Sequence, residues 1–378
     1  MKFAEIIGNN VAVNDLRRMI DSGQIPHALL ISGPSGIGKM LAARAFITYL
    51  NCENPVNGDA CGECASCKRI ALGNDPDIHY FYPIYKLASQ NLERSEDYAD
   101  EWKRFMEESP FMDITAWMEI MNGANSQPKI YVQDADEISR IASLSTYADK
   151  YKVIVIWLPE RLKIEAANKI LKILEEPYED TIFICVSNDP GSILPTIYSR
   201  LQRVEMKRPS AEDIEKFLDL RNVNPINRAT LARLSGGSFL RAFQLASDEG
   251  ETSEFGEWFR NIMRNAYARK AGILRNYADE VSAMGREKSL RLLSYFSRMT
   301  RENFISNLCI PPLNVMTHEE TSFSTKFAPF INVANVEEII EAIENARRDI
   351  SRNANSKLVW FDFMIILMIL LRKKPPQP

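Results

Sequence analysis

Short apolar runs alternate with amphipathic stretches over the first half of the chain. The run at 27–32 leads into a glycine-rich loop, and helical periodicity follows from 40 to 50. The runs at 153–158 and 181–187 are apolar at successive positions, which is typical of strands buried on both faces of a parallel sheet. Between them lies an amphipathic helical stretch that ends at Pro177. This alternation predicts an α/β fold with a parallel sheet.

The stretch between the first two apolar runs is less regular. Residues 84–127 are polar and aromatic, and we expect an insertion there, with helices at 98–108 and 114–121. Residues 130–132 then resume the apolar character of a strand. The insertion has no motif that assigns it a function.

The pattern changes after Pro209. Residues 210–248 predict short helices with a break at Gly236-Gly237, and from about 252 onward the chain is almost wholly helical. The longest apolar run, 358–371, contains Asp362 and is shorter than the roughly 20 residues that a membrane span needs. We therefore expect a buried helix there and no membrane association.

Composition and charge exclude several classes of protein. Hydrophobic residues make up 46% of the 378 residues and charged residues 25%, which excludes wholesale disorder. Lys and Arg total 46 against 50 Asp and Glu, so the net charge is −4, and any DNA contact must come from a local basic patch or a partner subunit. The N-terminal residues show no apolar signal core, and we expect a cytoplasmic location.

The loop Gly33-x-x-Gly36-x-Gly38-Lys39 is a candidate nucleotide site. Glycines let successive N–H groups turn toward a phosphate, the following helix N-terminus favours negative charge, and Lys39 can reach the β and γ oxygens. A complete P-loop continues with Ser or Thr, whose hydroxyl coordinates Mg²⁺, but Met40 stands there. The context of strand, loop and helix favours a P-loop over a plain glycine turn. Whether ATP or ADP binds stays open.

The second magnesium site of a hydrolysing P-loop enzyme also lacks its acids. Such an enzyme places carboxylates at the end of a buried strand. Trp157 and Leu158 follow the apolar run 153–156, and Glu160 comes later. One alternative is that a bulge in the chain lets Glu160 take the place of these acids. Because two independent positions have lost magnesium ligands, we expect no intrinsic ATPase activity.

Four of the six cysteines lie within 16 residues and predict a metal site. The set is Cys52, Cys61, Cys64 and Cys67. Four thiolates suit tetrahedral Zn²⁺, and a reducing compartment favours metal binding over disulfides. A closed set of ligands indicates a structural zinc; a redox-active pair or fortuitous thiols are the alternatives. We expect Cys185 and Cys309 in the core.

Several motifs together resemble a known family. The segments 27–39, 166–177 and 193–200, with the cysteine module, resemble those of the delta-prime subunits of bacterial DNA polymerase III, in the AAA+ clamp-loader family. The resemblance extends to about residue 245. It is weaker over the helical C-terminal part, where 353–358 fits.

The resemblance implies an AAA+ domain at 1–207, a helical lid at 208–248 and a helical collar at 249–378. It further implies a five-subunit ring with gamma/tau and delta subunits, which loads the sliding clamp onto primed DNA. Delta-prime members have degraded magnesium motifs, which agrees with Met40 and Trp157. A non-hydrolysing subunit is therefore expected; the alternatives are an active gamma/tau-type ATPase subunit and an unrelated P-loop enzyme such as a kinase.

The resemblance also assigns roles to arginines. The family's Ser-Arg-Cys motif is present as Ser199-Arg200-Leu201, so Arg200 is the expected arginine finger for a neighbouring subunit's nucleotide. The alternative is an ordinary surface arginine. Ser187-Asn188 stands where the first AAA+ sensor is expected, and Arg241 where the second is.

Overall fold

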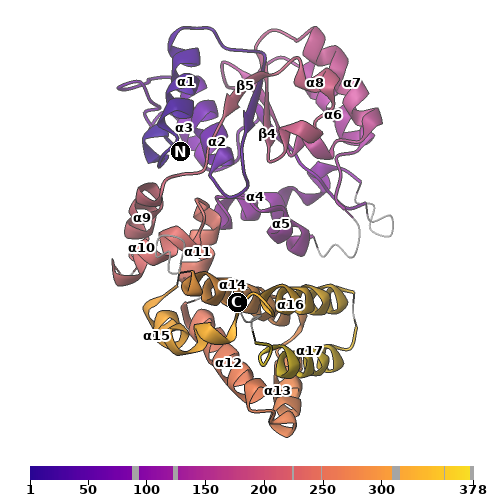
Figure 1. Cartoon of the computed structure of the whole chain (residues 1–378). Helices are drawn as coiled ribbons and strands as arrows, with labels where there is room; N and C mark the ends of the chain where they lie inside the picture. The colour runs from indigo at the N-terminus through magenta and orange to yellow at the C-terminus, as the bar shows by residue number, and fades with distance from the viewer. Residues whose placement is uncertain are drawn as a thin grey trace. The chain divides into compact units, whose positions relative to one another are not determined.

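The chain forms two compact units. A computed structural model describes residues 1–86, 93–121, 127–223, 225–247, 249–308, 316–352 and 354–374. The first unit contains Met1–Val223 and Ser235–Phe243, and the second contains Asn224–Leu234 and Gln244–Pro378 (Figure 1). Each unit has hydrophobic core clusters of its own. The limits of an AAA+ domain, a lid and a collar stay a prediction.

The first unit is built on a five-stranded parallel sheet, as the alternating pattern predicts. The strand order is β2-β3-β4-β1-β5, and every pairing is parallel. The strands are β1 (Ala28–Ser32), β2 (Ile78–Phe81), β3 (Lys152–Trp157), β4 (Thr181–Ser187) and β5 (Gln202–Glu205). The three central strands β3, β4 and β1 are buried at every position, which explains their continuous apolar sequences.

Helices cover both faces of this sheet (Figure 1). Successive strand residues alternate between the faces, so Leu29 and Ile31 join one core cluster while Ala28 and Leu30 join the other. The first cluster includes α1 (Asn10–Asp21), α2 (Lys39–Leu50) and α3 (Ala65–Ala71). The second includes α6 (Val132–Ala142), α7 (Ile164–Glu175) and α8 (Pro195–Tyr198). The result is the three-layer α/β arrangement of P-loop proteins.

The expected insertion contains the two expected helices. These are α4 (Ala99–Glu108) and α5 (Ile114–Ile120). Their aromatic side chains, including Trp102, Phe105 and Trp117, pack into the first core cluster. Residues 87–92 and 122–126 of the insertion lie outside the described part of the chain.

The prediction of a strand at 130–132 is wrong. Ile130 makes only an isolated bridge to Leu162, and α6 begins at Val132. The carboxylate of Asp134 accepts a hydrogen bond from the Tyr131 N–H at 3.2 Å, which caps this helix. Ile130 and Tyr131, directly before the helix, therefore have the apolar sequence of a strand start without forming a strand.

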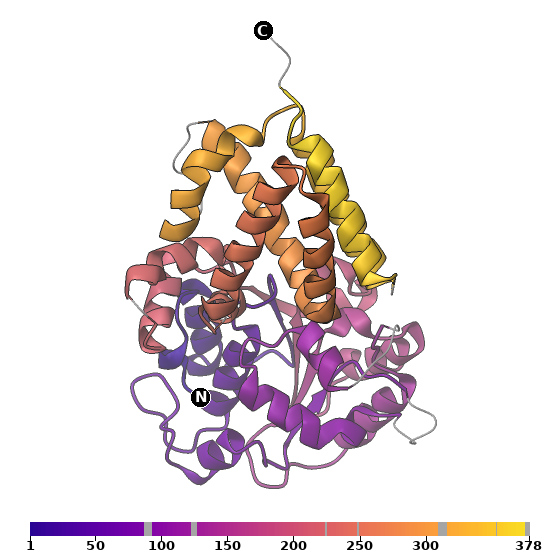
Figure 2. The same cartoon turned by 90° about the horizontal axis from the view of Figure 1, so that it is seen from below.

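After β5, all the regular elements of the described chain are helices. Along the chain, β5 is followed by α9 (Ala211–Leu220), α10 (Pro225–Leu234) and α11 (Phe239–Ser247). The second unit continues with α12 (Glu249–Tyr267), α13 (Ala271–Ala283), α14 (Arg286–Asn307), α15 (His318–Phe327), α16 (Val336–Ser351) and α17 (Ser356–Leu370). Figure 2 shows the orange-to-yellow helices of this unit packed side by side. Phe259, Phe296 and Trp360 are buried in its core.

The apolar run near the C-terminus is the expected buried helix. It forms α17, whose start is capped by the Asn355 side chain accepting the Leu358 N–H at 3.2 Å. Phe363, Met364 and Leu367 of this helix are buried in the core of the second unit. Within the described ranges, no helix is both long and apolar enough to cross a bilayer.

Candidate functional site

The glycine loop joins β1 to α2 at the carboxyl end of the sheet. Gly36 and Gly38 have φ values of 77° and 88°, a left-handed conformation that glycine adopts without steric cost. At Gly33 a Cβ atom would lie 2.2 Å from the Met206 carbonyl oxygen, so only glycine fits beside the end of β5. The structure thus places all three glycines and Lys39 in one strand–loop–helix turn.

Lys39 folds back onto its own loop. Its Nζ donates to the Pro34 carbonyl oxygen at 2.5 Å, and the side chain is buried. Burial lowers the pKa of Lys39 from 10.5 to about 8, and the nearby Glu160 charge opposes that shift. The amine that would contact phosphate oxygens is therefore engaged by the protein and is desolvated.

Residues 238–240 contact the loop directly. The Leu240 N–H donates to the Gly36 carbonyl oxygen at 3.2 Å. A Cβ at Gly36 would lie 2.4 Å from the Ser238 Oγ, and one at Gly38 would lie 3.9 Å from the Phe111 ring. Phe111 stacks on Phe239 at 5.3 Å between ring centroids. The insertion and the start of α11 therefore both pack against the P-loop.

An apolar pocket of about 300 Å³ adjoins this loop. N-terminal residues, the loop itself, the insertion and α9 all contribute to its wall. The apolar lining residues include Ile6, Ile7, Ile37, Leu41, Phe111, Phe217, Leu220 and Phe239. Sequence reasoning missed Phe111 and Leu240, because their contacts with the loop span about 75 and about 200 residues of chain and leave no local signal.

The positions that would hold magnesium are part of the hydrophobic core. Met40 is 3% exposed and Trp157 is 2% exposed. The Trp157 ring lies 5.3 Å from the Trp102 ring and 5.9 Å from the Phe105 ring. Neither Met40 nor Trp157 offers the oxygen ligand that Mg²⁺ requires.

Glu160 lies near the same edge of the sheet, but its carboxylate binds backbone N–H groups. Its Oε1 accepts hydrogen bonds from the backbone N–H groups of Asn188 at 2.9 Å and Asp189 at 3.2 Å. Its Oε2 is buried and has no hydrogen-bond partner among the described residues. The carboxylate thus fixes the turn after β4, where Ser187 is buried at the strand end.

Arg200 lies on the surface after α8. Its guanidinium donates to the Glu175 carboxylate and, at 2.6 Å, to the Thr196 carbonyl oxygen. The side chain is 33% exposed, and the following Leu201 is buried. Arg241 is exposed on the first turn of α11, where its backbone N–H donates to the Ser238 Oγ at 3.3 Å. Among the described residues, the Arg200 guanidinium forms no hydrogen bond to the P-loop of this chain.

The four clustered cysteines meet at one point. Their Sγ atoms all lie within 4.8 Å of one another. The members are Cys52, Cys61, Cys64 and Cys67. Cys64 caps the N-terminus of α3, and Cys67 lies in its first turn, so the helix fixes two of the four thiols. This donor set fits a tetrahedral zinc ion.

Backbone N–H groups point at the sulfurs. The N–H groups of Glu63 and Cys64 donate to Cys61 Sγ at 3.4 and 3.3 Å. These bonds lower the pKa of Cys61 to about 6, whereas burial raises the pKa of Cys67. Such donors stabilise thiolates and orient them as ligands. Cys185 is a core residue whose pKa burial raises to about 12, and Cys309 lies outside the described residues.

The cysteine loop also anchors the start of the chain. Lys2 Nζ donates to the Cys61 carbonyl oxygen at 2.7 Å. The Asp59 carboxylate accepts the N–H groups of Phe3 at 3.1 Å and Ala4 at 2.9 Å. Because residues 1 and 5–7 line the pocket beside the P-loop, the cysteine loop positions one wall of that pocket.

Comparison with known proteins identifies the family. A family model described as "DNA polymerase III, delta subunit" matches residues 8–210. The chain belongs to this family. The match covers the sheet, the cysteine cluster, the P-loop and Arg200, and it confirms the resemblance to the clamp-loader family.

Individual relatives carry related names. The chain is 30% identical over 224 residues to DNA polymerase III subunit delta' of Pseudomonas aeruginosa, over 59% of this chain and 56% of that protein. It is 29% identical over 213 residues to DNA polymerase III subunit tau of Bacillus subtilis, over 56% of this chain and 30% of that protein. These matches span about half of the first relative's length and less of the second's.

A solved structure also aligns with the chain. A DNA polymerase III gamma subunit-related protein of Thermotoga maritima is 14% identical, with a TM-score of 0.45 over 96% of this chain and 100% of that one.

Proposed function

We propose that the chain is a non-hydrolysing subunit of a DNA polymerase III clamp loader. In this role it joins gamma/tau and delta subunits in a five-membered ring and helps to load the sliding clamp onto primed DNA. Its family and the names of its relatives support the assignment to a clamp loader. The domain limits 1–207, 208–248 and 249–378 and a cytoplasmic location belong to the same proposal.

The burial of Trp157 carries the non-hydrolysing part of the proposal. Trp157 stands at the end of β3, where a hydrolysing enzyme needs a carboxylate, and aromatic rings of α4 surround it. Met40 is buried in the same core cluster. Neither residue offers an oxygen ligand to the magnesium of a bound nucleotide. The hydrogen bond from Lys39 to the Pro34 carbonyl oxygen further supports a P-loop whose role is more structural than catalytic.

Arg200 is proposed to act on a neighbour's nucleotide. A guanidinium forms paired hydrogen bonds to γ-phosphate oxygens and neutralises charge that develops during phosphoryl transfer. Arg200 is on the surface, and its partner Glu175 is 49% exposed. Surface ion pairs of this kind contribute only about 0–1 kcal/mol, so Arg200 can exchange Glu175 for a phosphate at small cost.

Zinc is proposed to be structural. Cys52, Cys61, Cys64 and Cys67 would hold the ion, which would crosslink the loop that anchors Lys2 and the residues after it. Four protein ligands complete the coordination of a structural zinc ion. No catalytic step is assigned to this site.

One observation favours the second candidate, an active gamma/tau-type subunit. Glu160 is close enough to Lys39 for its charge to oppose the lowering of the Lys39 pKa by burial. The Oε2 atom of Glu160 is buried without a hydrogen-bond partner in the described chain. A carboxylate oxygen of that kind is a potential magnesium ligand. The tau relative from Bacillus subtilis is about as similar in sequence as the delta' relative.

ATP hydrolysis separates the two candidates. The purified chain is assayed with Mg²⁺ and ATP beside its Lys39→Ala and Glu160→Gln variants. We expect no turnover above that of the Lys39→Ala variant. Turnover that both substitutions abolish would establish the active subunit instead. Reconstitution with gamma/tau and delta subunits then tests whether the chain is required for clamp loading.

A further inference from the structure

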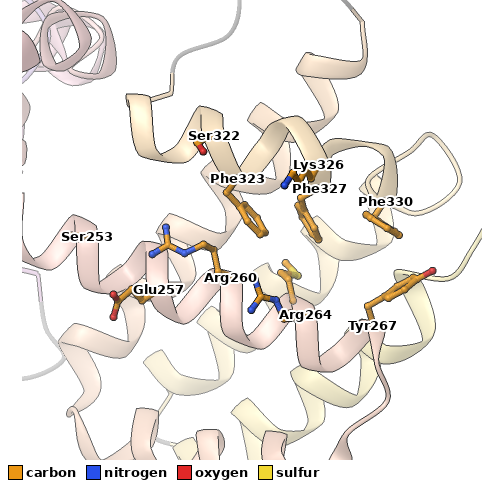
Figure 3. Close-up of a pocket in the computed structure, with 11 residues that line it drawn as sticks. Ser253, Glu257, Arg260, Arg264, Tyr267, Ser322, Phe323, Lys326, Phe327 and Phe330 are labelled. Carbon is orange, nitrogen blue, oxygen red and sulfur yellow. The ribbon is translucent and has the colours of Figure 1, made fainter.

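A groove of about 790 Å³ runs between α12 and α15 in the second unit (Figure 3). Residues 253, 257, 260, 264 and 267 of α12 line one side, at alternating spacings of four and three that keep them on one helical face. Residues 322, 323, 326 and 327 of α15, with Phe330 just beyond it, line the other side. The volume is within the range of about 300–1,000 Å³ that is usual for ligand sites.

The floor of the groove is a series of aromatic rings. Phe323 stacks on Phe327 at 5.0 Å, and Phe327 stacks on Phe330 at 5.9 Å. Phe330 meets Tyr267 edge to face at 4.6 Å. Met263 completes this floor and is fully buried. The series joins α15 to the end of α12 and gives the groove an apolar base.

The rim of the groove is basic. Figure 3 shows Arg260 and Arg264 on α12 and Lys326 on α15, on opposite sides of the groove. Across the described ranges of the chain, none of these three cations forms an ion pair. Glu257 is the one acidic residue among the groove's lining residues. The lining therefore has an excess of positive charge although the whole chain carries a charge of −4.

We propose that this groove binds a short acidic peptide segment of a partner protein. The segment carries a bulky apolar side chain that packs on the Phe323–Phe330 floor, and its carboxylates pair with Arg264 and Lys326 on the rim. Buried aromatic anchors surrounded by charge pairs are the usual source of affinity and specificity in protein interfaces.

The geometry favours a peptide over single-stranded nucleic acid. Nucleic-acid sites stack bases on open ring faces. Here Phe327 is only 7% exposed. Tyr267 is 41% exposed, but Phe330 packs on it edge to face and the Arg372 guanidinium lies 5.3 Å from its ring centroid. An inserted apolar side chain needs only the ring edges. The groove's residues belong to the second unit, so binding there does not depend on the P-loop, and this inference and the proposed function can fail separately.

The test uses the full chain and a fluorescein-labelled peptide of sequence DEFDELFD, with anisotropy as the readout. We expect saturable binding that weakens as salt is added, because the rim charges are exposed. The double variant Arg264→Glu/Lys326→Glu should lose affinity by about tenfold or more. Tyr267→Ala should also weaken binding. Arg275→Glu is the matched control: this exposed cation of α13 does not line the groove, and its variant should bind like the wild type.

Two further ligands make the outcome decisive. The peptide DEADELAD keeps the acids but lacks bulky aromatic side chains, and it should bind at least about tenfold more weakly. An oligothymidylate should bind more weakly than DEFDELFD. The proposal is overturned if the oligothymidylate binds more tightly, if neither ligand saturates, or if Arg275→Glu weakens binding as much as the groove variants do. The substituted rim residues are exposed, so these variants should keep the fold.

Discussion

The indole rings of Trp157 and Trp102 lie 5.3 Å apart, inclined by 53°. This contact joins the last residue of β3 to α4 of the insertion. Tyr82 stacks on Trp102 at 3.8 Å, and Trp117 and Phe105 also belong to the cluster around it, at 5.3 and 5.8 Å. The end of β3, which a hydrolysing enzyme reserves for a magnesium-binding acid, is therefore an apolar junction between the sheet and the insertion.

Truncating Trp102 should destabilise the first unit. The side chain is 3% exposed, and Trp→Ala changes at such sites cost about 3–5 kcal/mol through lost burial and a residual cavity. Urea denaturation followed by circular dichroism should show a lower midpoint for Trp102→Ala. Tyr147→Ala is the control, because Tyr147 is 87% exposed and its variant should unfold within about 0.5 kcal/mol of the wild type. An unchanged midpoint for Trp102→Ala would mean that α4 does not share the core of the sheet.

The sequence predicts the central sheet well and its edges poorly. β1, β3 and β4 are buried throughout, so their apolar residues run without interruption and mark each strand. β2 has only four residues, three of them half-buried, and β5 is exposed at three of its four positions. Edge strands carry mixed residues because one side faces solvent, so a pattern of apolar runs does not detect them.

The candidate site is likewise predicted only in part: the sequence predicts the groups that are close along the chain and misses the contacts between distant residues. The P-loop glycines and the cysteines are close in sequence, so their spacing predicts their geometry. Leu240 and Phe111 contact the P-loop across long stretches of chain, and nothing local marks them. The loss of magnesium ligands at Met40 and Trp157 could be read from the sequence, but the aromatic cluster that replaces them depends on the folded insertion.

The buried Lys39 should give stability a specific pH dependence. Its pKa is about 8 in the folded state against 10.5 when unperturbed. Between these values the unfolded chain holds one more proton, so the free energy of unfolding rises with pH, by about 3 kcal/mol at most. Below about pH 8 the folded protein bears the full cost of burying the charge. Subtracting the profile of Lys39→Met from that of the wild type isolates this effect from other groups. Parallel profiles between pH 8 and 10.5 would show that Lys39 is solvated.

Zinc should be bound stoichiometrically and should hold the N-terminus in place. Elemental analysis should find about one Zn²⁺ per chain, and Cys67→Ser should lose it, because three ligands bind structural zinc far more weakly. Cys185→Ala is the matched control, since Cys185 is a core residue of the other face of the sheet and its variant should keep the metal. A chain purified without chelator that holds no zinc would contradict the prediction.

Metal removal should also be visible in hydrogen exchange. The N–H groups of Phe3 and Ala4 are protected by the Asp59 carboxylate, which lies within the cysteine loop. Chelation should accelerate exchange at these two amides, because the loop loses its crosslink. Amides in the middle of β4 should exchange as slowly as before. If chelation leaves Phe3 and Ala4 protected, the metal does not support the N-terminal segment.

Arg200 should affect the ATPase of a ring without affecting its assembly. In the free chain its guanidinium is held by Glu175 and the Thr196 carbonyl oxygen on an exposed surface. In reconstituted complexes with primed DNA and clamp, Arg200→Ala should lower ATP hydrolysis and clamp loading, and Arg200→Lys should recover only part, because an ammonium lacks the planar fork of the guanidinium. A supplied arginine is worth about 10³–10⁵ in rate at one site, so the total rate of several sites should fall less.

Glu175→Gln removes the ion pair while leaving Arg200 intact, so this variant should hydrolyse ATP at least as fast as the wild type. If Arg200→Ala rings assemble and turn over normally, Arg200 serves only its surface contact with Glu175.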